Sequence, residues 1–351
     1  MNDISALDKN FAYKTFSENG VVYRDVRSAP FTVYGLEWDD DLGFVRVPND
    51  VAVQIGEQFA HLNRNVAGGR IRFRTDSEEI YVKCKISGSW RMTHMADAGS
   101  AGFDVYEVID GKQKFLCPIL PQKQTSDEWT ERATIPAGEH DIIINCPIFT
   151  SFTEILIGVK EGSRICEGGK YKYETPIVFY GSSITHGACA SRPGNIYENM
   201  ISRRFDTNYI NLGYSGNAKG EKPIIEYIAR LRMSIFVLDY DHNARSVEYL
   251  LSTHYAAYKT VRDAHPHLPI IMVTRPDFDK PRESGKPYRD VVAGTYERAV
   301  AEGDENVYFV DGEKEFSTFV ADGLSVDGSH PNDLGFALMA QKIGDVIAKL
   351  L

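Results

Sequence analysis

The hydrophobic pattern of this chain changes near its middle, and this change is the strongest constraint on its fold. Up to about residue 165, short runs alternate apolar and polar residues and are separated by Gly, Pro, Asp and Asn. A period of two is typical of half-buried β-strands. Beyond residue 176, short apolar runs alternate with segments of helical spacing, which predicts a parallel sheet with helices on both faces. The 351 residues exceed one ordinary domain and accommodate two.

The first half carries strand patterns throughout. Residues 70–87 form two alternating runs, and residues 103–120 predict a hairpin with Asp110-Gly111 at its turn. Residues 138–147 and 152–162 supply two further strands. Regularly spaced short strands without long helical patterns favour a jelly-roll-like all-β sandwich. We expect this domain to span residues 1–168.

A Gly-rich polar stretch that ends in proline, residues 167–176, marks the linker. The second domain is expected over residues 174–351, and a shortened chain that begins near Tyr171 is expected to fold alone. Its last helical pattern reaches the end of the chain.

Composition excludes several classes of partner. The net charge is -10 and no basic stripe is present, so we expect no nucleic-acid partner. No run approaches the ~20 apolar residues of a membrane helix. The first residues lack the apolar region of a signal peptide, which predicts a cytoplasmic protein. The five cysteines are scattered and form no CxxC pair, so we expect reduced thiols, no metal and no cofactor.

Polar residues follow the predicted strands of the second half, where ligands bind in open α/β sheets. Ser183 follows the first strand in the string GSSITHG, and Gly181 permits a sharp exit from that strand. Backbone N–H groups at such a turn favour an oxyanion. The alternative is that Ser182, Ser183 or Thr185 only caps a helix.

Three later loops complete a set of groups suited to acyl transfer. Gly216 follows the second strand and either offers its N–H to an oxyanion or simply forms a turn. Asn243 follows the third strand, and its amide either donates to developing negative charge or stabilises the loop. Asp327 can orient His330 as a base across the loop before the last helix, or this loop only caps that helix. Together these residues provide a nucleophile, a base, an orienting carboxylate and oxyanion donors.

With these motifs the chain resembles the SGNH hydrolases, also called the GDSL lipase/acylhydrolase superfamily. The sequence blocks of that family match GSSIT at Gly181–Thr185 and then Gly216, Asn243, Asp327 and His330. The resemblance implies a flavodoxin-like three-layer α/β/α hydrolase domain with Ser183, His330 and Asp327 as its triad. It also implies an oxyanion hole made by the Ser183 N–H, the Gly216 N–H and the Asn243 amide.

The resemblance extends to a two-domain bacterial branch whose N-terminal β-sandwich carries a Gly-x-Asp-Leu-Tyr-like motif. Residues 102–106, GFDVY, match that motif with Val in place of Leu. Two departures stand near the site. Ser182 replaces the common Asp beside the nucleophile, and Asp241-His242 replace the usual Gly-Gly before Asn243.

These observations predict a serine esterase that cleaves short acyl groups, acetyl above all, from carbohydrates or other small alcohols. The loops near the predicted site are small and polar, and some of their side chains could bind substrate hydroxyls: Arg192, Asn195, Asn217 and Arg245. Loops around Trp90 or Phe103 are candidates for the rim of the site. His186 and His242 are rival bases, and His330 is preferred because Asp327 stands at the right spacing to orient it.

Three other functions compete with this prediction. A metal hydrolase is disfavoured because no HExxH or comparable spacing is present, although ligands can be imagined at Asp239, Asp241, His242, His330 and Asp333. A glycan-binding protein with a weakly active or inactive hydrolase domain is the second alternative. A lipase or thioesterase for longer acyl chains is the third.

Overall fold

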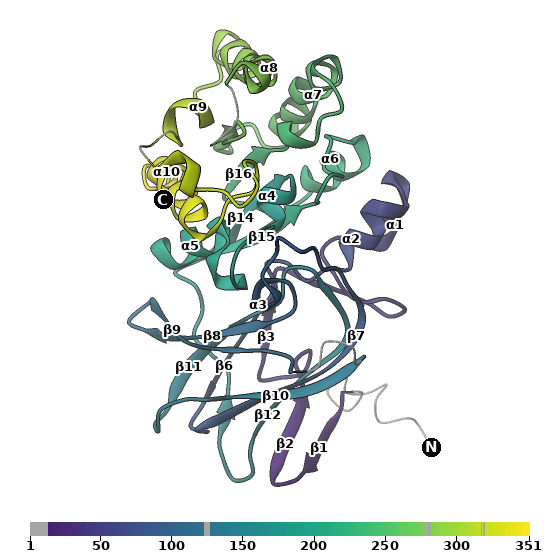
Figure 1. The fold of residues 1–351 in the computed structure, drawn as a ribbon, viewed down its shortest axis with the longest axis vertical. Helices are drawn as coiled ribbons and strands as arrows, with labels where there is room; N and C mark the ends of the chain where they lie inside the picture. Colours follow the sequence, from purple (N-terminus) through teal and green to yellow (C-terminus); the bar gives the residue numbers. More distant parts are fainter. Residues whose placement is uncertain (1–12, 123–126, 277, 279–281, 317, 319) are drawn as a thin grey trace.

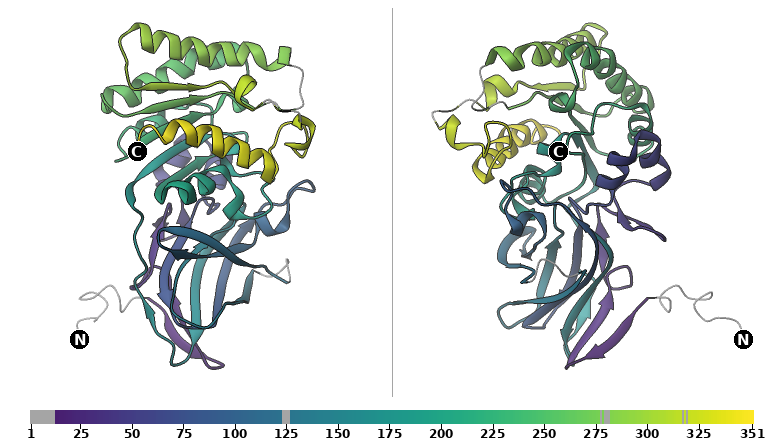
Figure 2. Two further views of the ribbon diagram at one scale, coloured as in Figure 1. Left: turned by 90° about the vertical axis from the view of Figure 1, so that its left-hand side faces the viewer. Right: turned by 45° about the vertical axis from the view of Figure 1, so that its right-hand side comes forward.

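The computed structural model describes residues 13–122, 127–276, 278, 282–316, 318 and 320–351. Within these ranges the strands of the first half lie at one end of the long axis and the second half lies at the other (Figures 1 and 2). The start of the chain, from which the cytoplasmic location was predicted, lies largely outside the described residues. No helix of the described residues has the length and apolar character needed to cross a membrane.

The first half forms the predicted β-sandwich. One sheet has the strand order β1-β2-β12-β7-β10: β1 (Thr15–Glu18), β2 (Val21–Asp25), β12 (Thr150–Lys160), β7 (Glu79–Ser89) and β10 (Glu128–Thr134). The other has the order β13-β6-β11-β8-β9, with β3 also paired to β6: β13 (Ile165–Cys166), β6 (Arg70–Thr75), β11 (His140–Asn145), β8 (Phe103–Ile109), β9 (Lys112–Ile119) and β3 (Thr32–Tyr34). A separate hairpin joins β4 (Glu37–Asp39) to β5 (Gly43–Val45).

The sandwich core and its predicted hairpin follow the sequence pattern. Alternate residues of β6 and β7 point into one core, where Phe73 and Val82 are fully buried. The predicted turn does join β8 to β9, and Asp110 and Gly111 have φ values of 51° and 74°. Two successive positive φ values fit a tight hairpin turn whose twist matches its strands.

The second half forms a parallel sheet in the order β15-β14-β16-β17-β18: β15 (Thr207–Gly213), β14 (Tyr173–Gly181), β16 (Ile235–Asp239), β17 (Ile270–Val273) and β18 (Val307–Val310). Because the first strand along the chain lies second in the sheet, the order is flavodoxin-like, as expected. One face packs against α6 (Lys222–Ile228), α7 (Val247–Ala264) and α8 (Arg282–Ala301). The other packs against α5 (Tyr197–Phe205) and α10 (Asp333–Ile347).

Short elements complete the second half and the seam with the sandwich. They are α3 (Asp97–Ser100), α4 (Ser183–His186), α9 (Gly312–Glu315), η3 (Pro193–Asn195), η4 (Asp241–Asn243) and η5 (Ala321–Gly323). Of these, α4 and η4 follow β14 and β16 directly, so both stand at the carboxyl edge of the sheet.

Two helices of the first half were not expected, α1 (Asn49–Ile55) and α2 (Glu57–Asn63). They leave the sandwich and lie beside α6 (Figure 1). Val51, Phe59 and Leu62 join the core on that face of the parallel sheet, and the Phe59 ring stacks on Tyr214 at 3.8 Å between centroids. The first half is therefore not purely β, and part of it belongs to the packing of the second half.

Candidate active site

Ser183 stands at the exit of the first parallel strand. Strand β14 ends at Gly181, and α4 begins at Ser183. A side chain at position 181 would run into Thr185 and the Asp239 carbonyl, so only glycine fits this turn. The Ser182 hydroxyl accepts a hydrogen bond from the Ile184 N–H at 3.2 Å and caps α4. Ser182 therefore does the capping and leaves the Ser183 hydroxyl available.

The three residues predicted to cooperate are brought together. Ser183 Oγ lies 2.8 Å from His330 Nε2, and His330 Nδ1 lies 2.7 Å from Asp327 Oδ2. The other oxygen of Asp327 accepts the backbone N–H groups of His330 and Ser329 at 2.8 Å and 3.0 Å. Although partial burial acts in the opposite direction, these bonds lower the pKa of Asp327 to about 2. The carboxylate is thus ionised at neutral pH and holds Nδ1 of His330 protonated, which leaves Nε2 to accept a proton.

The predicted oxyanion donors face the same cavity as Ser183. Gly216 and Asn243 both line it, and Gly216 has a φ of 67°, in the left-handed region. One N–H of the Asn243 amide donates to the Tyr214 carbonyl at 3.0 Å. Since a primary amide has two N–H donors, this bond fixes the side chain and leaves its second donor for another acceptor.

The cavity measures about 580 Å³ and is walled by both halves of the chain. Seven of its lining residues precede the linker: Gln58, Leu62, Trp90, Met92, His94, Met95 and Phe149. Trp90 was expected at the rim, whereas Phe103 is fully buried in the sandwich core and does not line the cavity. The prediction from the polar loops of the second half therefore covered only part of the cavity wall. The apolar part of this wall comes mainly from the first half.

Comparisons with known proteins agree with this geometry. Residues 174–348 match the model of the GDSL-like Lipase/Acylhydrolase family, and residues 21–165 match the model of the N-terminus of SGNH-hydrolase-type esterases, named GxDLY. The chain belongs to the GDSL-like lipase/acylhydrolase family. It is accordingly an ester-bond hydrolase. A search of curated proteins found no match.

Several solved structures share the two-part architecture of this hydrolase. A GDSL-like lipase from Bacteroides ovatus is 29% identical with a TM-score of 0.83, covering 94% of this chain and 98% of its own. A salicylyl-acyltransferase from a tetracycline biosynthetic pathway is 19% identical with a TM-score of 0.78, covering 95% and 98%. A family two carbohydrate esterase from Clostridium thermocellum, solved with cellohexaose, is 14% identical with a TM-score of 0.62, covering 91% and 98%.

The rival base His186 is engaged elsewhere in the hydrolase. It is fully buried, and its Nε2 lies 3.1 Å from the Ile148 carbonyl, to which it donates. Its Nδ1 then accepts from the Ser215 hydroxyl at 3.2 Å. Burial, and secondarily the charge of Arg46, lowers the pKa of His186 well below its usual value. His186 is a neutral structural link between the two halves.

The other rival base, His242, lines the cavity beside Asn243.

Asp239 and Asp241, which were considered as possible metal ligands, accept hydrogen bonds from protein donors. Asp239 accepts from Thr185 and Tyr197, at 3.1 Å and 3.3 Å, beneath the nucleophile turn. Asp241 accepts the Arg275 N–H at 3.1 Å and also pairs with its guanidinium. Within the described parts of the chain, the five imagined residues do not gather into a group with metal-ligand spacing.

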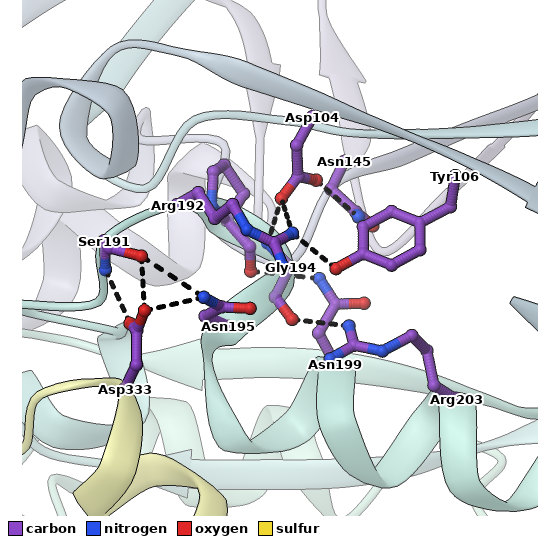
Figure 3. A network of polar contacts seen from close by, with 11 residues as sticks. Asp104, Tyr106, Asn145, Ser191, Arg192, Gly194, Asn195, Asn199, Arg203 and Asp333 are labelled. Carbon is purple, nitrogen blue, oxygen red and sulfur yellow. Dashed lines mark hydrogen bonds and ion pairs between the residues drawn. The ribbon is translucent and has the colours of Figure 1, made fainter. Parts of the chain in front are cut away.

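The GxDLY motif ties the sandwich to the loop after the nucleophile (Figure 3). Asp104 is fully buried and accepts hydrogen bonds from Asn145 at 2.7 Å, Arg192 at 2.9 Å and the Gly194 N–H at 2.8 Å. Arg192 also donates to the Tyr106 hydroxyl at 2.5 Å. Arg192 does not line the cavity, and its guanidinium binds the aspartate and the tyrosine of the motif, so the prediction that it binds substrate hydroxyls is wrong.

The same loop is bound on its other side to the helix that follows His330. Asp333, the first residue of α10, accepts from the Ser191 N–H at 2.8 Å and from the Asn195 amide at 2.8 Å (Figure 3). Asn195 is thus a link within the protein and not a hydroxyl ligand, contrary to expectation. The network connects the sandwich to the loop that carries the candidate base.

Of the other two residues predicted to bind hydroxyls, Arg245 is exposed and lies outside the cavity wall, whereas Asn217 does line the cavity.

A buried polar cluster beneath the nucleophile turn was missed by sequence reasoning. The Asn211 amide donates to the Thr185 carbonyl at 2.6 Å and to Glu198 at 3.2 Å. Burial raises the pKa of Glu198 well above its usual value, which favours the neutral form of this group. Asn211 interrupts the apolar pattern of its strand, and this interruption was the available signal.

Proposed function

We propose that this hydrolase is a serine esterase in which Ser183 is the nucleophile, His330 the general base and Asp327 the group that orients the base. The supporting observation is the continuous chain of contacts, 2.8 Å from Ser183 Oγ to His330 Nε2 and 2.7 Å from His330 Nδ1 to Asp327. Nucleophile, base and orienting group within hydrogen-bond reach are the signature of an activated serine.

The reaction follows from these positions. Ser183 Oγ attacks the acyl carbonyl while His330 Nε2 takes its proton, and the ionised Asp327 stabilises the resulting imidazolium. The carbonyl oxygen gains negative charge, which the N–H groups of Ser183 and Gly216 and the Asn243 amide stabilise. His330 then protonates the leaving alcohol, and a water molecule releases the acyl group from Ser183 by the same steps.

For the substrate, we propose a short acyl ester, an acetyl ester above all, of a sugar-like alcohol. The cavity offers polar groups at Gln58, Asn217 and Arg275 and an aromatic ring at Trp90, which is 45% exposed. An exposed aromatic ring beside polar side chains suits a ligand that is apolar on one face and hydroxylated at its edges. The similarity in fold to a carbohydrate esterase solved with cellohexaose supports the same choice.

A second substrate class has its own support. Met92, Met95 and Phe149 give one wall of the cavity an apolar character. Because each buried methylene contributes ~0.8 kcal/mol, such a wall could hold a longer acyl chain. This variant of the proposal keeps the same triad and changes only the acyl group.

Two series of esters separate these substrates. We expect kcat/KM to be highest for acetyl among the acetyl, butyryl, octanoyl and palmitoyl esters of p-nitrophenol. We also expect an acetylated sugar to be hydrolysed with a lower KM than p-nitrophenyl acetate. A maximum at octanoyl or longer would instead show a lipase or thioesterase, and an absence of all hydrolysis would contradict the proposed function.

A further inference from the structure

Three side chains of types that bind transition metals converge beside the cavity, which two of them, His94 and His330, line. The ligand atoms of His94, Cys189 and His330 all lie within 4.8 Å of one another. The rings of His94 and His330 are 6.0 Å apart between centroids. The three residues come from separate loops: one before α3 in the first half, one after α4 and one before α10. Folding, and not local sequence, brings them together.

The chemistry of this set suits Zn²⁺. Two imidazoles and one thiolate are zinc ligands, and three protein ligands leave a fourth position for water. Ligand atoms on a tetrahedral zinc ion lie about 3.5 Å apart, given bonds of about 2.0–2.3 Å. The three side chains therefore need to close by only about 1 Å to hold the ion.

The surroundings of the cluster also favour a cation. His330 Nδ1 is held by Asp327 at 2.7 Å, so Nε2 is the nitrogen left for a metal. A carboxylate that orients a histidine in this way is the usual second partner in metal sites. Cys189 is 7% exposed, has a φ of 74° that non-glycine residues rarely adopt, and has no part in the proposed esterase mechanism.

We propose that His94, Cys189 and His330 form an inhibitory site for Zn²⁺. The ion binds Nε2 of His330, which is the atom that must accept the Ser183 proton, so metal binding and ester hydrolysis exclude each other. Coordination involves no redox change: the Cys189 thiol proton and the displaced metal-bound waters go to solvent. The inhibitory effect rests on the proposed role of His330, whereas the metal site itself does not.

Inhibition by Zn²⁺ alone tests the effect on activity. We expect saturable inhibition of the full chain that a chelator reverses. We expect the inhibition constant for Zn²⁺ to rise by at least about tenfold in Cys189→Ser and in His94→Gln. The reason is that even residues that only support a metal ligand contribute about 10–100-fold to metal affinity. Inhibition of each variant is measured relative to its own activity without metal. Cys166→Ser, which removes the exposed cysteine of β13, is the matched control and should keep the wild-type inhibition constant.

Direct binding tests the site apart from catalysis. Co²⁺ added to the full-length Ser183→Ala protein should produce a cobalt–thiolate charge-transfer absorption that saturates at one equivalent. The additional substitution Cys189→Ser should abolish this absorption, and His94→Gln, in a partly exposed loop, should weaken binding without a change in the fold. Absence of the thiolate band, or equal inhibition of wild type and both variants, overturns the proposal. Metal binding by the Ser183→Ala protein is measured without any enzymatic activity, so this result stands even if the proposed function fails.

Discussion

The core of the β-sandwich and the two cores beside the parallel sheet are assembled differently. All buried members of the sandwich core come from residues 26–157. The cores on the two faces of the parallel sheet also take side chains from the first half, from residues 47–62 on one face and from Ala67, Ile148 and Phe149 on the other. The sandwich core is thus complete by itself, whereas the cores of the hydrolase half are not.

The two halves of the chain also contribute different kinds of residue to the active-site cavity. The residues proposed to take part in the reaction, Ser183, Asp327 and His330, all follow the linker, whereas Trp90, Met92 and other residues of the wall precede it. The first half is therefore a structural part of the hydrolase and not merely an attached module.

Removal of the first half should have the largest effect. The sequence alone predicted that a chain beginning near Tyr171 folds, but the shared cores lead us to expect aggregation. Without residues 47–67, the apolar surface that Phe59 and its neighbours cover is exposed to water. Analytical ultracentrifugation and thermal unfolding of residues 171–351, beside the full chain, check this. A monomer with a cooperative transition would show that the borrowed side chains are dispensable.

Ser183→Ala should abolish ester hydrolysis and leave the cavity wall unchanged. We expect kcat to fall by about 10⁶, the usual effect of losing a triad nucleophile, with an unchanged melting temperature. Steady-state kinetics and circular dichroism measure both quantities. Residual turnover above about a thousandth of the wild-type value would exclude Ser183 as the nucleophile.

Asn243→Ala should have a smaller effect confined to turnover. We expect kcat to fall by roughly 10²–10³ with little change in KM, because the amide binds the oxygen only as it becomes charged. Asn217→Ala is the matched control, since Asn217 lines the same cavity and its amide is bound to the Ser215 carbonyl. A rise in KM at normal kcat, or equal effects of both substitutions, would remove Asn243 from the oxyanion hole.

Trp90→Ala should have the smallest effect and the opposite kinetic pattern. Because Trp90 belongs to the wall, we expect KM to rise by at most about tenfold, or 1.4 kcal/mol, while kcat is nearly unchanged. Ile109→Ala, at an exposed apolar site on β8 away from the cavity, controls for general surface effects. A large loss of kcat in Trp90→Ala would mean that the wall also positions the reacting groups.

The elements, and the meeting of Ser183, Asp327 and His330 at one edge of the sheet, could be predicted from the sequence because both depend on local patterns. Strand and helix periodicities are local, and the residues after parallel strands meet at one edge of the sheet wherever they stand in the chain. Ser183 and His330 are 147 positions apart, yet their loops were recognisable separately. One boundary was not evident from the sequence: a helical pattern is clear only from Asp290 onward, whereas α8 already begins at Arg282 and includes Pro287.

The contacts between the halves could not be predicted from local patterns. Helices α1 and α2 have seven residues each, too short for a clear helical period. Arg192 looked like a ligand for hydroxyls because its partner Asp104 lies 88 positions away, in the other half of the chain. Only tertiary packing decides whether a polar loop residue binds substrate or another part of the chain.

Labelling with a fluorophosphonate shows whether Ser183 is an activated serine. The reagent reacts with a serine hydroxyl that a neighbouring base has activated, and peptide mass spectrometry locates the adduct. We predict one adduct on the wild-type chain, at Ser183, and a strong loss of labelling in His330→Ala. An adduct at another residue, or an unlabelled Ser183 in a folded protein, would show that Ser183 is not the activated nucleophile.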